Sequence, residues 1–174
     1  MTEEVTETLF VRNPNYEKGG CTMSEADNKI LTRHLLEEVV NTGLVDRLPE
    51  FMSSDCRDPN TNIQGLAGFR EHLLMFHTCY PDMVVTVDGQ VAEEDIVVTW
   101  WTMRGTHSGD WGDVKATHKP IRLSGVNIER IRNGRIVEHF GGSNSLEALL
   151  ELGVVKWVNG QPENPCNSKS RTAY

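Results

Sequence analysis

The feature that most constrains the fold is a pair of β-branched, partly alternating runs, residues 118–132 and 135–144, separated only by Asn133-Gly134. A tight hairpin turn needs positive φ at both of its central residues, and Asn-Gly is strongly preferred there. The two runs are therefore predicted to form an antiparallel β-hairpin.

A short helix is predicted directly after the hairpin. Residues 146–152 are rich in leucine, and Gly153 follows them, as is typical of a helix C-terminus. Asn144 stands at the joint between strand and helix, and asparagine is among the best N-cap residues. The spacing from Asn144 to Glu147 also fits a capping box, so a cap alone and a cap that also contacts a ligand are equally supported.

Further helices and strands are predicted upstream from the spacing of apolar residues. The first helix begins after Ser24, a suitable N-cap, and ends at the sequence Asn-Thr-Gly of residues 41–43. Helices are also expected at residues 44–52 and 65–77, a brief strand or loop at 54–60, and longer strands at 83–92 and 96–105.

This order of elements indicates an α+β fold. Helices that precede a meander of antiparallel strands close one face of a curved sheet, which forms a cone with an interior pocket. The domain is expected to span residues 24–153, after an N-terminal extension (1–23) and before a C-terminal tail (154–174).

Composition argues against several classes of partner. The net charge of −8 opposes binding to nucleic acid or to an anionic membrane surface, and no apolar run reaches membrane-spanning length. The N-terminus lacks the basic start and apolar middle of a signal peptide. Four cysteines without metal-binding spacing indicate free thiols, a cytoplasmic location and no metal site.

Several groups of residues fit one known family in order and spacing. They are residues 28–29, 37–39, 43, 65–69, 80–87, 94–97, 104–109, 123–128, 133–140 and 149–153. Together they resemble the SnoaL-like polyketide cyclases, also called ester cyclases, of the NTF2-like superfamily. The resemblance covers residues 25–153, which is the whole predicted domain.

The resemblance implies a cone-shaped α+β barrel, often a homodimer or homotetramer, that works without a metal or an organic cofactor. Known members close a ring of a polyketide by intramolecular aldol condensation, and one aspartate at the end of the last strand is the general acid and base. This chain has Asn144 at that position. An amide cannot exchange a proton near neutral pH, so another residue would have to replace that aspartate.

The last strand offers candidates for this role. If Asn144 faces the pocket, the two-residue period of a strand puts Glu138 and Phe140 on the same side, as an acid and a substrate contact. The two glycines after Phe140 can introduce a bulge that resets this phase, so His139 is also a candidate base. The alternative for His139 is a half-exposed residue at a subunit interface.

Neighbouring elements supply further candidates, each with a simpler alternative. Asn127 and Glu129 share one face of the preceding strand as substrate contacts, although an exposed Glu129 paired with an arginine is the default expectation. His107 lies in a polar loop at the mouth of the cone, where it either takes part in catalysis or pins a turn. Asp58 either points at a ligand or is a solvated loop charge.

Trp100 and Trp101 are consecutive in one strand, so one is expected to face the interior and the other to face outward. The inward tryptophan would pack in the core or line the pocket.

Three functions fit these observations. The first is a cofactor-free enzyme that cyclises or isomerises a polyketide-like or apolar polycyclic small molecule, with a hydroxylase-like family member as a variant. The second is a non-catalytic binder of a small molecule, and the third is a dimerisation module. An enzyme needs a titratable group in its pocket, whereas a binder needs only apolar groups, amides and hydroxyls.

Overall fold

The predicted α+β class is confirmed by the computed structural model, which describes residues 23–156. Most of the predicted N-terminal extension and C-terminal tail therefore lies outside the described residues. The elements, in chain order, are α1 (Glu25–His34), a π-helical segment (Leu35–Val40), a 3-10 turn (Val45–Arg47), α2 (Leu48–Phe51), β1 (Met52–Arg57), α3 (Gly65–Cys79), β2 (Val84–Glu93), β3 (Ile96–Thr106), β4 (Pro120–Arg132), β5 (Arg135–Ser143) and α4 (Ser145–Leu152).

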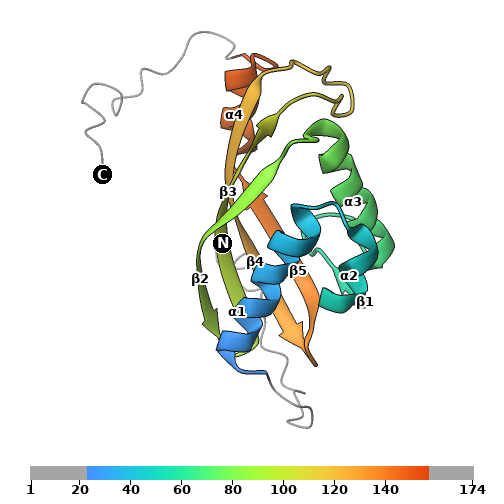
Figure 1. The fold of residues 1–174 in the computed structure, drawn as a ribbon, viewed down its shortest axis with the longest axis vertical. Coiled ribbons are helices and arrows are strands. Elements are labelled where there is room, and N and C mark those ends of the chain that lie inside the picture. The colour runs from blue at the N-terminus through green and yellow to red at the C-terminus, as the bar shows by residue number, and fades with distance from the viewer. Residues whose placement is uncertain (1–22, 157–174) are drawn as a thin grey trace, which may run out of the picture.

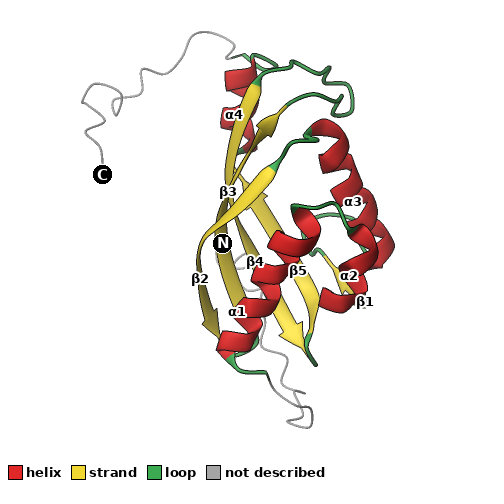
Figure 2. Ribbon diagram, in the orientation of Figure 1, coloured by secondary structure: helices red, strands yellow, loops and turns green. Residues whose placement is uncertain are grey.

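The strands form one curved sheet in the order β1-β5-β4-β3-β2. Strands β2 to β5 pair antiparallel, whereas β1 runs parallel to β5 at one edge. Helices α1, α2 and α3 lie on one side of the sheet, and α4 lies at one end of it (Figures 1 and 2). We call the sheet face that these helices cover the inner face, and the opposite one the outer face.

The predicted hairpin joins β4 to β5. Asn133 and Gly134 have φ values of 50° and 71°, which are the positive angles that the turn requires. The ladder above the turn shifts in register, because Arg130 pairs with Glu138 while Ile131 pairs with Ile136. One extra residue, Val137, is therefore accommodated in β5 as a bulge, which sets the faces on which the rest of that strand presents its side chains.

The first helix is fixed at both ends. Ser24 and Asp27 form a reciprocal capping box at its start, as expected for a serine N-cap. The helix continues as the π-helical segment, and the amide of Asn41 then binds both backbone groups of Val85 in β2, at 2.9 Å and 2.7 Å. These bonds attach the helical layer to the edge of the sheet.

The predicted second helix, residues 44–52, is shorter in the structure than expected. It consists of the 3-10 turn and the four-residue helix α2, and Met52 already belongs to β1. Pro49, near the start of α2, fits the first turn of a helix, where no backbone N–H is needed. The short β1 is followed by α3, which contacts it on the inner face.

The interior contains two apolar clusters with a polar band between them. One cluster includes Val97 and Ile131, and the other includes Met103 and Leu123, so β3 and β4 each contribute to both. Between these apolar positions, the inner face of the two strands carries residues 99, 101, 125, 127 and 129. Three of them, Thr99, Asn127 and Glu129, are buried polar residues, so this band is where the fold places interior chemistry.

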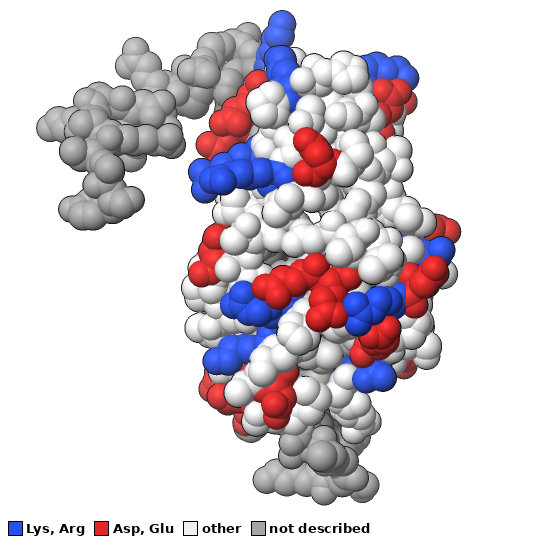
Figure 3. Space-filling model, in the orientation of Figure 1, with Lys and Arg blue, Asp and Glu red and all other residues white. Residues whose placement is uncertain are grey.

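No helix within residues 23–156 is long and apolar enough to cross a membrane. Acidic and basic side chains are interspersed over the lower half of the face seen in Figure 3, in the region of α1 and α2. The net charge of −8 therefore does not form a single acidic patch on that face.

Gly125 tests how closely the inner face is packed. A Cβ atom at this position would overlap the carbonyl oxygen of Gly142 and the indole ring of Trp101. We expect Gly125→Ala to lower the free energy of unfolding by about 1–3 kcal/mol in urea denaturation, because overpacking forces neighbours out of position. Gly142→Ala is the matched control: its Cβ would lie 3.9 Å from Phe140, so its effect should stay within about 0.5 kcal/mol. Equal losses in the two variants would contradict this account of the packing.

Candidate active site

A buried glutamate and a histidine face each other within the polar band. Glu129 of β4 and His139 of β5 are directly opposite in the antiparallel ladder, so their side chains share the inner face. The Nδ1 atom of His139 lies 3.3 Å from the Oε1 atom of Glu129. Glu129 has no exposed surface, whereas 21% of the His139 side chain is exposed. Glu129 therefore belongs to the buried core, whereas solvent reaches part of His139.

The second carboxylate oxygen of Glu129, Oε2, is buried and has no hydrogen-bond partner among residues 23–156. A buried carboxylate is costly unless it is paired, so His139 is the group on which the charge of Glu129 depends. A carboxylate accepts hydrogen bonds only, so the neutral imidazole that satisfies this contact carries its hydrogen on Nδ1. Its Nε2 atom then keeps a lone pair and can accept a proton.

Helix α3 supplies two residues that surround His139. The ring of Phe69 meets the imidazole edge-on, with centroids 5.5 Å apart and an interplanar angle of 89°. Burial lowers the pKa of His72, and the positive charge of His139 lowers it further, while Asp58 acts in the opposite sense. His72 is therefore a neutral neighbour near neutral pH.

A glycine, Gly141, lies beside the Nε2 atom of His139. A Cβ atom at Gly141 would lie 3.4 Å from Nε2 and 3.7 Å from the Oδ1 atom of Asn127, so glycine keeps side-chain bulk away from both groups. The indole Nε1 of Trp101 donates to that Oδ1 atom at 2.9 Å. This bond fixes the amide of Asn127, whose Nδ2 then remains available as a donor beside the histidine.

These groups form an acid–base arrangement. Nε2 of His139 can take a proton, Glu129 can stabilise the imidazolium that results, and the Nδ2 of Asn127 can donate a hydrogen bond to a nearby developing negative charge. The glutamate acts through the histidine, which is the orienting role that an acid plays in catalytic triads. Among the residues that the structure describes, no three His, Cys, Asp or Glu side chains cluster in a way that would hold a metal ion.

Several expectations about the inner face prove wrong. Glu138 and Phe140 are on the outer face, because the register of β5 turns His139 inward. Glu138 accepts hydrogen bonds from Arg130 and Arg57, at 3.0 Å and 2.6 Å, and these cations lower its pKa against the opposing effect of its burial, which is the largest single influence. Glu129, for which an exposed position was the default expectation, is fully buried.

Asn144 is the N-cap residue of α4, as predicted, but the capping box does not form. Its Oδ1 accepts from the backbone N–H of Ser124 at 2.9 Å, and its Nδ2 donates to the carboxylate of Glu147 at 3.1 Å. Both ends of the amide are therefore occupied in joining α4 to β4. Side chains alternate along β5 as predicted, but Asn144 does not face the interior, so Glu138 and Phe140 do not face it either.

The remaining candidates lie apart from the Glu129–His139 pair. His107 is fully buried and does not lie at an open mouth of the sheet. Its Nδ1 contacts the hydroxyl and the backbone N–H of Thr117, which fits the alternative in which this histidine stabilises a turn. Asp58 is buried and accepts from the backbone N–H of Asn60, so it is not a solvated loop charge. It nevertheless influences His72, and so lies at the margin of the site.

The expectation for the two tryptophans is confirmed. Trp101 points inward to Asn127, whereas Trp100 lies on the outer face and is 43% exposed. Of the predicted site residues, the structure thus brings together His139, Glu129, Asn127 and Trp101.

The sequence interpretation missed His72 and Phe69 as neighbours of the site. Both lie on the apolar stripe of α3, with Phe76 four residues after His72, and this spacing was the available signal. The glycines of the last strand were expected either to widen the pocket or to let another backbone approach, and Gly141 lies beside His139 and Asn127, which a glycine in a strand does not reveal by itself.

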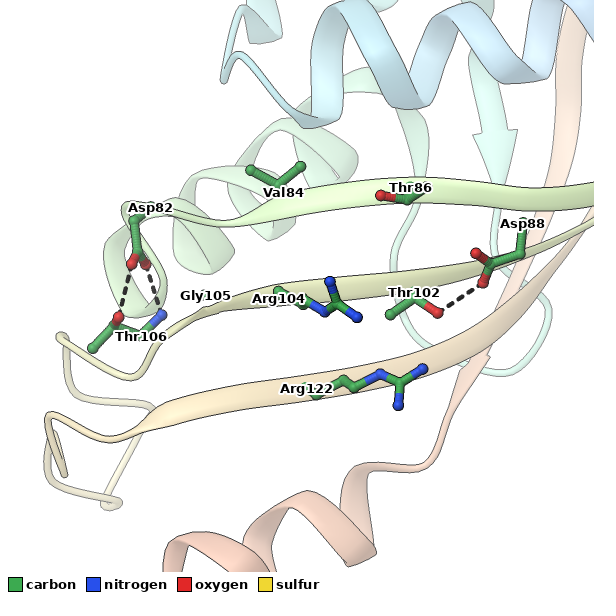
Figure 4. A pocket seen from close by; sticks show the side chains of 9 residues that line it. All are labelled: Asp82, Val84, Thr86, Asp88, Thr102, Arg104, Gly105, Thr106 and Arg122. Atoms are coloured by element: carbon green, nitrogen blue, oxygen red, sulfur yellow. Dashed lines mark hydrogen bonds between the residues drawn. The ribbon is translucent and has the colours of Figure 1, made fainter. Parts of the chain in front are cut away.

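A hollow of about 550 Å³ lies on the outer face of the sheet, over β2, β3 and β4 (Figure 4). Threonines, two aspartates and two arginines line it, and no histidine does. Aspartate and arginine side chains at the surface are poor proton shuttles near neutral pH, so the inner face is the better candidate for acid–base chemistry despite the size of this hollow.

A curved five-stranded sheet with helices on one side is a SnoaL/NTF2-like fold, which the structural neighbours of this chain share. A family model described as SnoaL-like polyketide cyclase matches residues 30–152, more than half of the chain. The chain therefore belongs to the SnoaL-like polyketide cyclase family, and the resemblance seen in the sequence is confirmed. None of the curated proteins matches the chain.

Solved structures with the same fold include three from Streptomyces. TsrD from Streptomyces laurentii is 23% identical, with a TM-score of 0.71 over 76% of this chain and 99% of that one. IdmH from Streptomyces antibioticus, a proposed polyketide cyclase, is 28% identical, with a TM-score of 0.64 over 72% of this chain and 98% of that one. AclR from Streptomyces galilaeus, a proposed hydroxylase, is 24% identical, with a TM-score of 0.68 over 78% and 90%. The likeness to TsrD and AclR is one of fold.

The Glu129–His139 pair should show strong coupling in a double-mutant cycle. His139→Ala leaves a buried carboxylate without its partner and should cost about 3 kcal/mol of unfolding free energy, the lower end of the usual range because His139 reaches solvent. Adding Glu129→Gln should recover at least about 1 kcal/mol of that loss, since the unpaired charge is gone. Urea denaturation of the four proteins measures this, and strictly additive losses would contradict the pairing.

Cys56 offers a pH-dependent test of the interior. Burial raises the pKa of its thiol to about 12, and the charge of Glu129 is the next cause. The folded state thus retains a proton that the unfolded chain releases above about pH 9, so stability is complete below that pH and falls as the pH rises. We expect the loss to reach at most about 1.4 kcal/mol per pH unit between pH 9 and 11. Urea denaturation across this range should show a shallower slope for Cys56→Ala, and an identical slope would contradict it.

Proposed function

We propose that the protein is a cofactor-independent enzyme that removes a proton from a carbon atom next to a carbonyl group of a polyketide-like or other apolar polycyclic small molecule. The observation that carries this proposal is the 3.3 Å contact between His139 Nδ1 and the fully buried Glu129. It supplies a base in a chain that has Asn144 where the family's aspartate is expected.

In the proposed first step, His139 Nε2 takes the proton as the carbon–hydrogen bond breaks, and the electron pair moves to the carbonyl oxygen as an enolate. Asn127 Nδ2 donates a hydrogen bond to that oxygen, held in position by the bond from Trp101 to Oδ1. Glu129 stabilises the imidazolium through Nδ1–H.

In a cyclisation, the enolate carbon then attacks a second carbonyl of the same molecule, and one carbon–carbon bond forms. The alkoxide that results takes the proton back from His139, so the base is restored and no other reactant is needed. Without a second carbonyl in reach, return of the proton at another atom gives an isomerisation. The family membership and the likeness to IdmH support carbon-acid chemistry of this kind.

Exchange of carbon-bound hydrogen tests the first step without knowledge of the natural substrate. We expect the wild-type protein to speed deuterium incorporation next to the carbonyl of 2-tetralone, an apolar bicyclic ketone, followed by NMR in D₂O. His139→Gln should lower the protein-dependent rate by about 10²-fold or more, the contribution typical of a general base. Glu129→Gln should lower it by about tenfold or more, because the imidazolium loses its partner.

Two further variants make the test specific. Gly141→Ala should also slow exchange, since it places a methyl group 3.4 Å from Nε2 while the base itself remains. His34→Gln is the matched control, because His34 lies on the surface of α1 beside Glu38, and it should leave the rate unchanged. If 2-tetralone quenches the fluorescence of Trp101 but exchanges no faster than with His139→Gln, the protein is a binder and not this enzyme.

A further inference from the structure

The outer hollow contains two arginines for which residues 23–156 supply no hydrogen-bond or ion-pair partner. Arg104 of β3 and Arg122 of β4 are directly opposite each other in the antiparallel ladder. Figure 4 shows their guanidinium groups on the same face of neighbouring strands. Like charges at opposite positions of a ladder repel and destabilise the sheet. Such a pair therefore calls for a compensating negative charge.

Every other arginine in residues 23–156 has a partner. Each of the rest contacts a carboxylate or a backbone carbonyl: Arg33, Arg47, Arg57, Arg70, Arg130, Arg132 and Arg135. For Arg104 and Arg122, none of the described residues supplies such a contact. In a chain of net charge −8, which has an excess of carboxylates, two unpaired neighbouring arginines are a local exception.

The two acids that line the hollow are already engaged by threonines. Asp82 accepts from the backbone N–H and the hydroxyl of Thr106, both at 2.7 Å, and Asp88 accepts from the hydroxyl of Thr102 at 2.7 Å. These bonds hold both carboxylates away from the arginines, as Figure 4 shows. The hydrogen bonds from Thr106 lower the pKa of Asp82, so that carboxylate remains charged at neutral pH without neutralising the pair.

We propose that this hollow binds the phosphate group of a small molecule, held between Arg104 and Arg122. A phosphate dianion matches the two positive charges, and its oxygens can accept the paired N–H donors of both guanidinium groups. A volume of about 550 Å³ has room for a small molecule that carries such a group. The site lies on the face opposite the Glu129–His139 pair, so its occupation does not depend on the proposed catalysis.

Calorimetric titration with inorganic phosphate tests the site, at constant ionic strength maintained with chloride. The wild-type protein should bind one phosphate per chain, and Arg104→Gln and Arg122→Gln should each weaken binding about tenfold, the loss of one charge-assisted contact. Arg33→Gln is the matched control, since Arg33 is a surface arginine of α1 paired with Glu37, and it should bind as the wild type does. Acetate, with one negative charge, should bind more weakly than phosphate.

Thermal unfolding in phosphate-free buffer of low ionic strength gives a second readout. Replacing either arginine should raise Tm by about 1–3 °C, because the repulsion between them is removed. Phosphate should raise the Tm of the wild type and not that of the double variant. Equal phosphate affinity in the wild type and the double variant overturns the proposal. So does a wild-type dimer that dissociates when both arginines are replaced, because carboxylates of a second copy would then occupy the hollow.

Discussion

The contact between Glu129 and His139 is the interaction on which the interior depends. It pairs a carboxylate that is fully buried in the polar band between two apolar clusters, where an unpaired charge would be costly. The surrounding groups support it: Phe69 bounds the imidazole, the pKa of His72 is lowered, and Gly141 leaves space at Nε2. The same arrangement satisfies one oxygen of the buried carboxylate through Nδ1 and leaves the Nε2 of His139 for a further contact.

Much of the fold could be predicted from the sequence, because its signals are local. The Asn133-Gly134 turn, the Ser24 cap and the α4 segment that ends at Gly153 each depend on a few neighbouring residues. Pairing of β1 parallel to β5 had no such signal, since it joins segments about eighty residues apart. Short helices such as α2 were overestimated because apolar spacing does not reveal where a strand takes over.

The site was harder to predict, because it depends on which face each residue of β5 occupies. The family position of Asn144 suggested an interior amide, and Glu138 followed from it by alternation. In the structure Asn144 joins α4 to β4, so this alternation assigns Glu138 to the outer ion pairs and His139 to the interior. The burial of Glu129 was missed for a related reason: a carboxylate is buried only where a partner from another strand meets it.

The bulge at Val137 has a consequence for how this chain can vary in length. Adding or deleting one residue between Ile131 and Glu138 would exchange the two faces of β5, so that Glu138 entered the interior and His139 met Arg130. The loop of residues 107–119, which lies outside the ladder, is not subject to that constraint. Insertions or deletions in residues 107–119 should therefore be tolerated far better than those at the Asn133-Gly134 turn, because they do not change the faces that the side chains of β5 occupy.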